Sequence, residues 1–356
     1  MDKQEKIDTI KRVLRYYLIT RCVLLILIIF YKIFLPYFPS EFNTIAELFD
    51  NQHYLNIAKD GYTVYYQYAF FPLIPLLIRY LGRWGFIILN QILVVMSGYL
   101  IYLVDKNIFK NKDNDVPVIF WMISPISVFT CMYYTEGIFI FLTLMAYYLY
   151  KTEKNYVILG IVLGLCVATR SIGSMLFFAI FIVMMIKVFK KQEKFKNVII
   201  TYIPATIISC LYPIYLYFDT GNPLYFIDAQ SYWLKVPTNI FMVFFDAIKY
   251  MDFKYSLFFD FNYLLTLCIF IYVYYLMIKN RKEKKYYDIF LYLIFSLISI
   301  CSIIKAFYDP LASYYRYVFG CFPIYFILER NRCVFYMLLI LSIIVATLFL
   351  SGTYFF

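Results

Sequence analysis

The sequence predicts an all-α, polytopic membrane protein, because its composition is too apolar for a soluble fold. Of 356 residues, 63% are hydrophobic, 23% are aromatic and 15% are charged, and the mean hydropathy is +0.72. A soluble domain carries about 25% charged residues and just under half apolar residues. So few polar groups could not cover 40 Tyr and 38 Phe in water. This composition excludes a cytosolic enzyme, a disordered chain and a small secreted scaffold.

Eleven apolar segments predict the membrane crossings of one integral-membrane domain, residues 1–356. A spanning helix needs about 20 apolar residues, and several of these segments have shorter uncharged cores, as helices lined by protein or water do. Basic residues precede the first segment as in a signal peptide. No small-residue cleavage site follows it, so we expect a retained helix. The predicted crossings are 18–38, 84–104, 115–133, 135–150, 156–170, 171–187, 198–218, 257–278, 287–304, 316–329 and 333–352.

The basic residues predict the orientation of these crossings. Lys and Arg are enriched in cytoplasmic loops, and with the N-terminus inside, 22 of the 33 Lys and Arg residues fall on the inner side. They lie in short runs between apolar segments rather than along one face, so the net charge of +11 does not indicate a nucleic-acid partner. Two large outer loops, 36–82 and 219–256, and a short one near 305–316 remain as places for chemistry.

The first outer loop predicts a short amphipathic helix that carries a carboxylate and a histidine. Thr44 and Glu47 fit a capping box and Gly61 fits a helix terminator, so we expect a helix over 44–61. Its apolar residues, Ile57 among them, could lie on the membrane surface. Asp50, His53 and Tyr54 follow the i, i+3, i+4 spacing and share a face, where the carboxylate could act as a general base. The alternative interpretation is a solvated helix face with an ordinary Asp–His contact.

Further charged residues lie at membrane depth, where they are costly and usually face the protein interior or a wet cavity. Glu136 and Arg170 each lie at a turn between two apolar segments, and Lys305, Asp309 and Arg316 cluster at another turn. Arginine can clamp a phosphate with two hydrogen bonds, although a structural ion pair between Arg170 and Glu136 is an equal alternative. We expect Asp50, Glu136, Arg170 and Arg316 to line one outer cavity, with the carboxylates on one side and the cations on the other.

Several segments, in order along nearly the whole chain, resemble the PIG-V family of mannosyltransferases, which comprises GPI mannosyltransferase II of eukaryotes and bacterial relatives. The first block, FDNQHYLNIAKDGY (49–62), is the most specific. Two departures are Phe49 in place of the usual Trp and Ser124-Pro125 in place of Asn-Pro. The other blocks are YAFFPLIPLL (68–77), SPISVFTCMYYTEGIFIFLTLMAYYLY (124–150), ATRSIG (168–173), GNPLYFIDAQSYW (221–233) and SYYRYVFGCFPIYFIL (313–328).

The resemblance implies a GT-C glycosyltransferase fold whose active site opens to the outer face of the membrane. It implies an inverting enzyme with a polyprenyl-phosphate hexose donor, mannose in this family, and a lipid or glycan acceptor. No metal site or cofactor is required, although a divalent cation could assist the reaction. The short chain favours a bacterial cell-membrane enzyme. The residues assigned to the site are Asp50 as the catalytic carboxylate and His53, Tyr54, Gln67, Glu136, Arg170, Arg316 and Tyr317 as substrate and donor contacts.

A transporter or flippase for a lipid-linked sugar is the alternative function. Transporters also place polar cavities among broken helices near the middle of the membrane. The chain shows no internal repeat and few charges midway through its spans, which favours the transferase.

Overall fold

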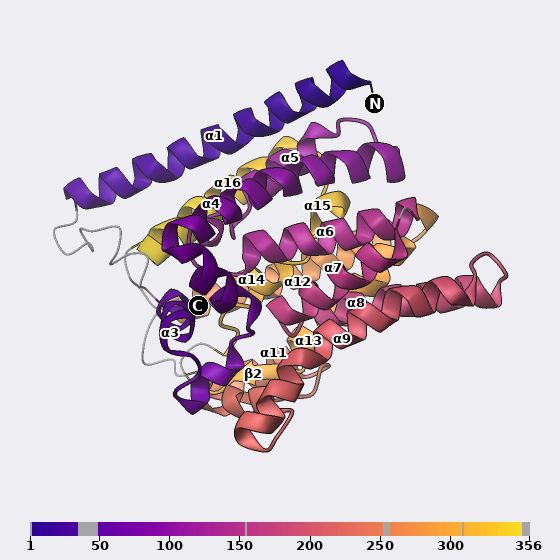
Figure 1. Ribbon diagram of the computed structural model, residues 1–356. Coiled ribbons are helices and arrows are strands. Elements are labelled where there is room, and N and C mark those ends of the chain that lie inside the picture. Colours follow the sequence, from indigo (N-terminus) through magenta and orange to yellow (C-terminus); the bar gives the residue numbers. More distant parts are fainter. Residues whose placement is uncertain (1, 35–48, 154, 252–256, 308–309, 351–356) are drawn as a thin grey trace.

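The computed structural model describes residues 2–34, 49–153, 155–251, 257–307 and 310–350 (Figure 1). These residues form a helical protein with one short two-stranded ladder. This architecture confirms the predicted all-α class. Four described helices are long and apolar enough to cross a membrane: Lys3–Phe30, Leu73–Ile108, Phe195–Thr220 and Arg332–Leu350. The predicted capping box at Thr44 and Glu47, and Asp309, lie outside the described residues.

The first two long helices match the predicted apolar segments but extend beyond them. Helix α1 (Lys3–Phe34) includes the basic residues that precede its apolar part. Helix α4 (Leu73–Leu103) begins directly after Pro72, whose fixed φ suits a helix start, and is interrupted at Gly82, where φ is 72°. A turn of π-helix, η2 (Val104–Ile108), follows. In Figure 1, α1 runs along the outside of the bundle beside α4 and α16.

Two predicted crossings are not continuous helices. Segment 115–133 forms α5 (Asp115–Met122), an irregular stretch and η3 (Phe129–Cys131). Segment 316–329 forms α14 (Tyr314–Phe319) and α15 (Ile324–Ile327), joined by a turn. The prediction of two single spanning helices was therefore wrong. Almost every residue of both segments is buried, so protein rather than lipid surrounds the backbone groups that the breaks release.

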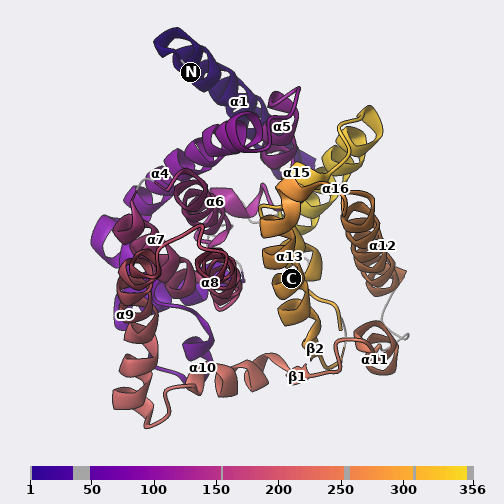
Figure 2. The same cartoon turned by 90° about the vertical axis from the view of Figure 1, so that its right-hand side faces the viewer.

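The other predicted crossings form helices close to the expected ranges. Figure 2 shows the helices of residues 136–220 on one side of the molecule and those of residues 257–350 on the other. A 3-10 turn, η5 (Lys284–Tyr286), lies between the helix that ends at Lys279 and the helix that begins at Tyr287. The helices are α6 (Glu136–Thr152), α7 (Tyr156–Thr169), α8 (Gly173–Phe189), α9 (Phe195–Thr220), α12 (Leu257–Lys279), α13 (Tyr287–Cys301) and α16 (Arg332–Leu350).

The loops predicted to lie outside contain short elements that pack on one another. The first loop forms α3 (Asp50–Asp60) and η1 (Tyr65–Ala69). The second forms α10 (Tyr225–Asp228), η4 (Ala229–Trp233), β1 (Lys235–Pro237) and α11 (Val243–Tyr250). Strand β1 pairs antiparallel with β2 (Ile303–Lys305), so that Lys235 lies opposite Lys305. The ladder thus joins the second loop to the chain that leads into α14.

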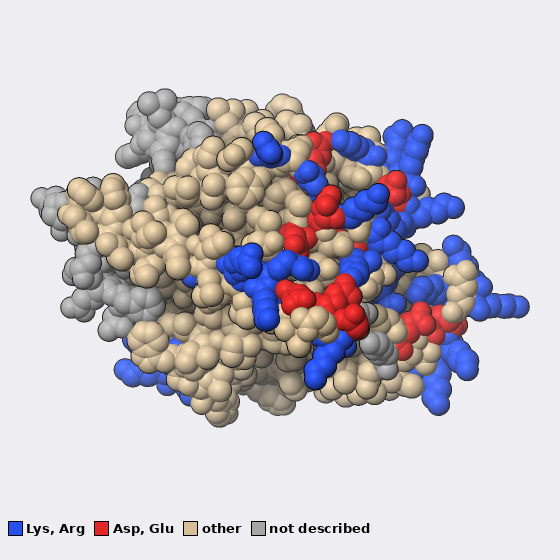
Figure 3. Space-filling view, turned by 90° about the horizontal axis from the view of Figure 1, so that it is seen from above, with Lys and Arg blue, Asp and Glu red and all other residues tan. Residues whose placement is uncertain are grey.

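Charged side chains gather at the other end of the molecule. Figure 3 shows Lys, Arg, Asp and Glu concentrated toward the end that carries the N-terminus of α1. Ion pairs there join the loops that the sequence predicts to lie inside: Lys151 with Asp288 at 2.7 Å and Arg330 with Asp105 at 2.6 Å. Asp105 is fully buried and also accepts a hydrogen bond from Asn111, so this end is tied together by a polar network.

Candidate active site

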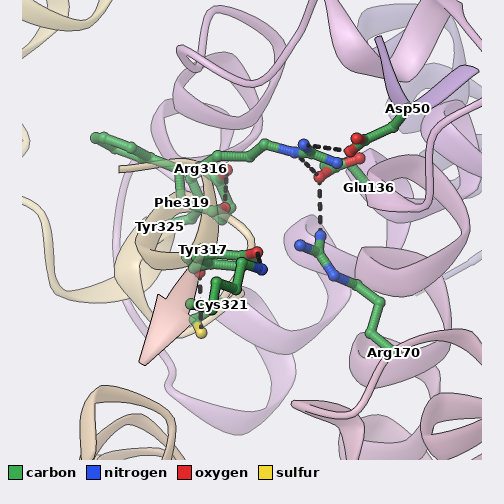
Figure 4. Close-up of polar contacts among 9 residues, drawn as sticks. Asp50, Glu136, Arg170, Arg316, Tyr317, Phe319, Cys321 and Tyr325 are labelled. Atoms are coloured by element: carbon green, nitrogen blue, oxygen red, sulfur yellow. Dashed lines mark hydrogen bonds and ion pairs between the residues drawn. The ribbon is translucent and has the colours of Figure 1, made fainter. Parts of the chain in front are cut away.

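Four charged residues from four separate elements form one ion-pair network (Figure 4). Arg316 donates from Nε to Glu136 Oε1 at 2.5 Å and from Nη1 to Asp50 Oδ2 at 3.0 Å. Arg170 donates from Nη1 to the same Glu136 oxygen at 2.8 Å. The structure thus brings together all four residues that the sequence predicts for one cavity. It alternates carboxylates and cations instead of placing them on opposite sides.

The ends of three helices position these charges. Asp50 and Glu136 are the first residues of α3 and α6, where free amides and the helix dipole favour a negative charge. Arg170 directly follows the last residue of α7, where the dipole favours a positive charge. Arg316 lies in α14, one of the two short helices of the broken C-terminal segment. Each of the three helix ends therefore stabilises the charge that it brings to the network.

The structure defines both ends of the helix that carries Asp50. Phe49 has a φ of 55°, so α3 begins at Asp50, and the predicted start at Thr44 lies outside the described residues. At its other end, Gly61 terminates the helix with a φ of 81°, as predicted. The prediction that Ile57 lies on the membrane surface was wrong, because that side chain is buried in the protein core. Arg79 of α4 donates to the carbonyls of Ala58 and Lys59 and thereby fixes the end of α3.

The two carboxylates differ sharply in exposure. Glu136 has no exposed side-chain surface, whereas the Asp50 side chain is 32% exposed. The guanidinium of Arg316 is 5% exposed and lies over the rings of Tyr134 and Phe129, at 4.5 and 4.9 Å from their centroids. Glu136 and Arg316 therefore form the buried part of the network, and Asp50 is its exposed carboxylate.

Tyr317 and Lys235 extend the site toward the second loop. Arg170 Cζ lies 5.0 Å from the centroid of the Tyr317 ring, and Lys235 Nζ lies 3.5 Å from the Tyr317 hydroxyl. Sequence reasoning assigned Tyr317 to the site but missed Lys235. The available signal was a lysine two residues after Trp233, next to the segment 221–233 that carries the resemblance.

His53 and Tyr54 lie among aromatic rings near Asp50. The His53 ring packs against Phe70, Trp233 and Tyr66, with centroids 5.0, 5.2 and 5.5 Å away. Burial lowers the pKa of His53 below its usual value, and the nearby charge of Asp50 offsets only part of this effect. The imidazole is therefore neutral near pH 7, able to donate one hydrogen bond and accept another. Burial also raises the pKa of Tyr54, which keeps its hydroxyl protonated.

Gln67 is engaged within its own loop. It is 3% exposed, and its Oε1 accepts hydrogen bonds from the backbone amides of Thr63 at 2.9 Å and Val64 at 3.3 Å. These bonds stabilise the start of η1, whose tyrosines lie against η4. A contact between Gln67 and a substrate stays a prediction.

Comparisons of the chain with protein-family models, with curated proteins and with solved structures gave no match. Within the described residues, no group of three or more His, Cys, Asp and Glu side chains is arranged to hold a metal ion. The chemical interpretation of the site therefore rests on the network itself and on the motif resemblance.

Proposed function

We propose that this protein is a membrane glycosyltransferase of the GT-C type. It transfers a hexose from a polyprenyl-phosphate donor to a hydroxyl group of a lipid or glycan acceptor. The observation that carries the proposal is the partly exposed carboxylate of Asp50. Its Oδ2 lies 3.0 Å from Nη1 of the buried Arg316, at a polar site between apolar helices. The same proposal includes eleven crossings, two of them made by broken helices, a cytoplasmic N-terminus and a site that faces the outside of a bacterial cell membrane.

The proposed reaction uses Asp50 as the general base. Its carboxylate takes the proton of the acceptor hydroxyl, and the hydroxyl oxygen forms a bond to the anomeric carbon of the hexose. The bond between that carbon and the phosphate oxygen breaks, and polyprenyl phosphate leaves with the electron pair. The anomeric configuration is inverted because attack and departure take place on opposite faces. Fixed cations near the phosphate stabilise the charge that develops on the leaving oxygen.

The motif resemblance supports mannose as the hexose. The polar residues around Asp50 are compatible with a sugar, since His53 and Tyr54 offer hydrogen-bonding groups and Trp233 offers a ring face. Phe49, which stands where the family has Trp, packs against Phe349 with ring centroids 5.7 Å apart, so this residue contributes to the core.

The test is transfer by Asp50→Asn, compared with wild type and with Asp60→Asn. Asp60 is an exposed carboxylate at the other end of the same helix, so it is a matched control. We expect Asp50→Asn to lower transfer of radiolabelled mannose from polyprenyl phosphate mannose by about 10²–10⁴-fold, the usual contribution of a general base. Asp60→Asn should transfer at the wild-type rate. Wild-type turnover by a folded Asp50→Asn protein would remove Asp50 from the mechanism.

A further inference from the structure

Arg316 is held by more protein groups than Arg170 is. Two of its guanidinium nitrogens donate to carboxylates, one to Glu136 and one to Asp50, and aromatic rings lie against the group. Its side chain is 5% exposed. A phosphate that took Arg316 as its main partner would lie beside two carboxylates that already compensate the guanidinium, and uncompensated buried charges are costly. The anion of a substrate therefore needs other cations.

Arg170 and Lys235 are the cations with free capacity. Among the described residues, only Nη1 of Arg170 donates to a protein acceptor, and its other guanidinium nitrogens have no protein partner. Lys235 is half-buried and forms no ion pair with a described carboxylate, and its ammonium contacts only the hydroxyl and ring of Tyr317. Both cations lie within 6.0 Å of the centroid of the Tyr317 ring, so they contact the same side chain.

The β1–β2 ladder fixes Lys235 at this place. Three residue pairs are in register, and Lys235 and Lys305 are direct partners. Paired residues of an antiparallel ladder project to the same side of the sheet, so the pairing sets the face on which the Lys235 side chain lies. The ladder also joins the second outer loop to the chain before α14, which carries Arg316 and Tyr317.

We infer that Lys235 and Arg170, which both contact Tyr317, form the subsite that binds the phosphate of the donor. Lys235 supplies a point charge and Arg170 supplies paired N–H donors, which together suit a phosphate monoester or diester. This assignment rests on the proposed function, and it moves the phosphate contact from Arg316 to a lysine outside the resembling motifs. Lys235 then stabilises the leaving phosphate, while Arg316 orients the carboxylates.

The test is binding of a polyprenyl monophosphate to the purified full-length protein in mixed micelles, with the matching polyprenol as a probe that lacks phosphate. The variants are Lys235→Gln, which removes the charge, and Lys235→Arg, which keeps it. The matched control is Lys249→Gln, an exposed lysine in the same outer loop that lies over Tyr250. Thermal unfolding of each variant shows whether it has folded.

We expect Lys235→Gln to weaken binding of polyprenyl monophosphate about tenfold or more, the effect of losing one charge-assisted contact. Lys235→Arg should recover most of the affinity, Lys249→Gln should bind as wild type does, and polyprenol binding should not change in any variant. Equal affinities of Lys235→Gln and wild type would overturn this subsite and leave the transferase proposal intact. Failure of wild type to bind polyprenyl monophosphate at all would overturn the donor class as well.

Discussion

Glu136 is the residue on which the candidate site depends most directly. One of its oxygens accepts hydrogen bonds from Arg316 and from Arg170, and the side chain is completely buried. Removing one partner of a buried ion pair leaves the other charge without compensation, which costs more than the pair contributes. Here a single carboxylate compensates two arginines, and one of those arginines also holds Asp50. Glu136 is thus a positioning residue for the exposed carboxylate.

Replacement of Glu136 by Gln is therefore expected to destabilise the protein. The expected loss is about 3 kcal/mol, since the buried guanidinium of Arg316 and the partly buried one of Arg170 lose their shared anion. The measurement is the midpoint of thermal unfolding in detergent. The control is Glu153→Gln, because Glu153 forms an exposed ion pair with Lys187 at 3.4 Å and its loss should cost within about 1 kcal/mol. An equal effect of the two substitutions would show that the network does not stabilise the fold.

Sequence reasoning found the charged residues of the site but not how they are paired. Charges at membrane depth are conspicuous because they are expensive there, which is how Glu136 and Arg170 were recognised. Their partners depend on which helix ends meet, and Arg316 reaches Asp50 across 266 residues of sequence. Lys235 was missed for the same reason. Its position two residues after Trp233 does not show what it contacts, and only the pairing of β1 with β2 brings it to Tyr317.

Among the elements, helices α7 and α9 show how glycines on one helix allow close contact with its neighbour. A Cβ atom on Gly160 would lie 2.0 Å from the carbonyl oxygen of Thr201, and one on Gly164 would lie 2.6 Å from the Cβ of Ile208. Glycines four residues apart let two helix backbones approach closely, a common arrangement in membranes. Because Arg170 directly follows α7, this contact also sets the position of a cation of the site.

Substitution of Gly160 by Val should separate α7 from α9. Three added carbon atoms cannot fit against the Thr201 carbonyl, so we expect a loss of about 2 kcal/mol or more from overpacking. Val157→Leu is the control, because Val157 lies on the same helix and is 49% exposed. Thermal unfolding of the two variants provides the comparison. If Gly160→Val unfolded at the wild-type temperature, the close approach of the two helices would be contradicted.

At the scale of the whole molecule, the lengths of the apolar segments predicted where helices lie but not where they break. Segments 115–133 and 316–329 are as apolar as true spans, yet each is divided into short helices. Their backbone breaks are tolerated because surrounding helices bury them, and such burial is a tertiary property that hydropathy along the chain does not contain. The two broken segments meet in the site, where Cζ of Arg316 lies 4.9 Å from the centroid of the Phe129 ring.

The charge distribution predicts a direct test of orientation. In a variant without native cysteines, we expect Asp60→Cys to react with a membrane-impermeant maleimide on intact cells, because α3 belongs to the proposed outer face. Lys191→Cys lies in the basic turn after α8 and should react only after the membrane is permeabilised. Both positions are exposed in the structure, so accessibility reports the side of the membrane. The reverse labelling pattern would contradict the proposed orientation.

The measurement that tests the central claim most directly uses purified protein in liposomes that contain a radiolabelled polyprenyl-phosphate hexose and a membrane lipid extract. We expect the label to leave the donor and appear covalently in a new lipid or glycan product. Polyprenyl phosphate should be released in equal amount. Movement of intact donor from one leaflet to the other, without any labelled product, would contradict a transferase and indicate a lipid-linked sugar flippase.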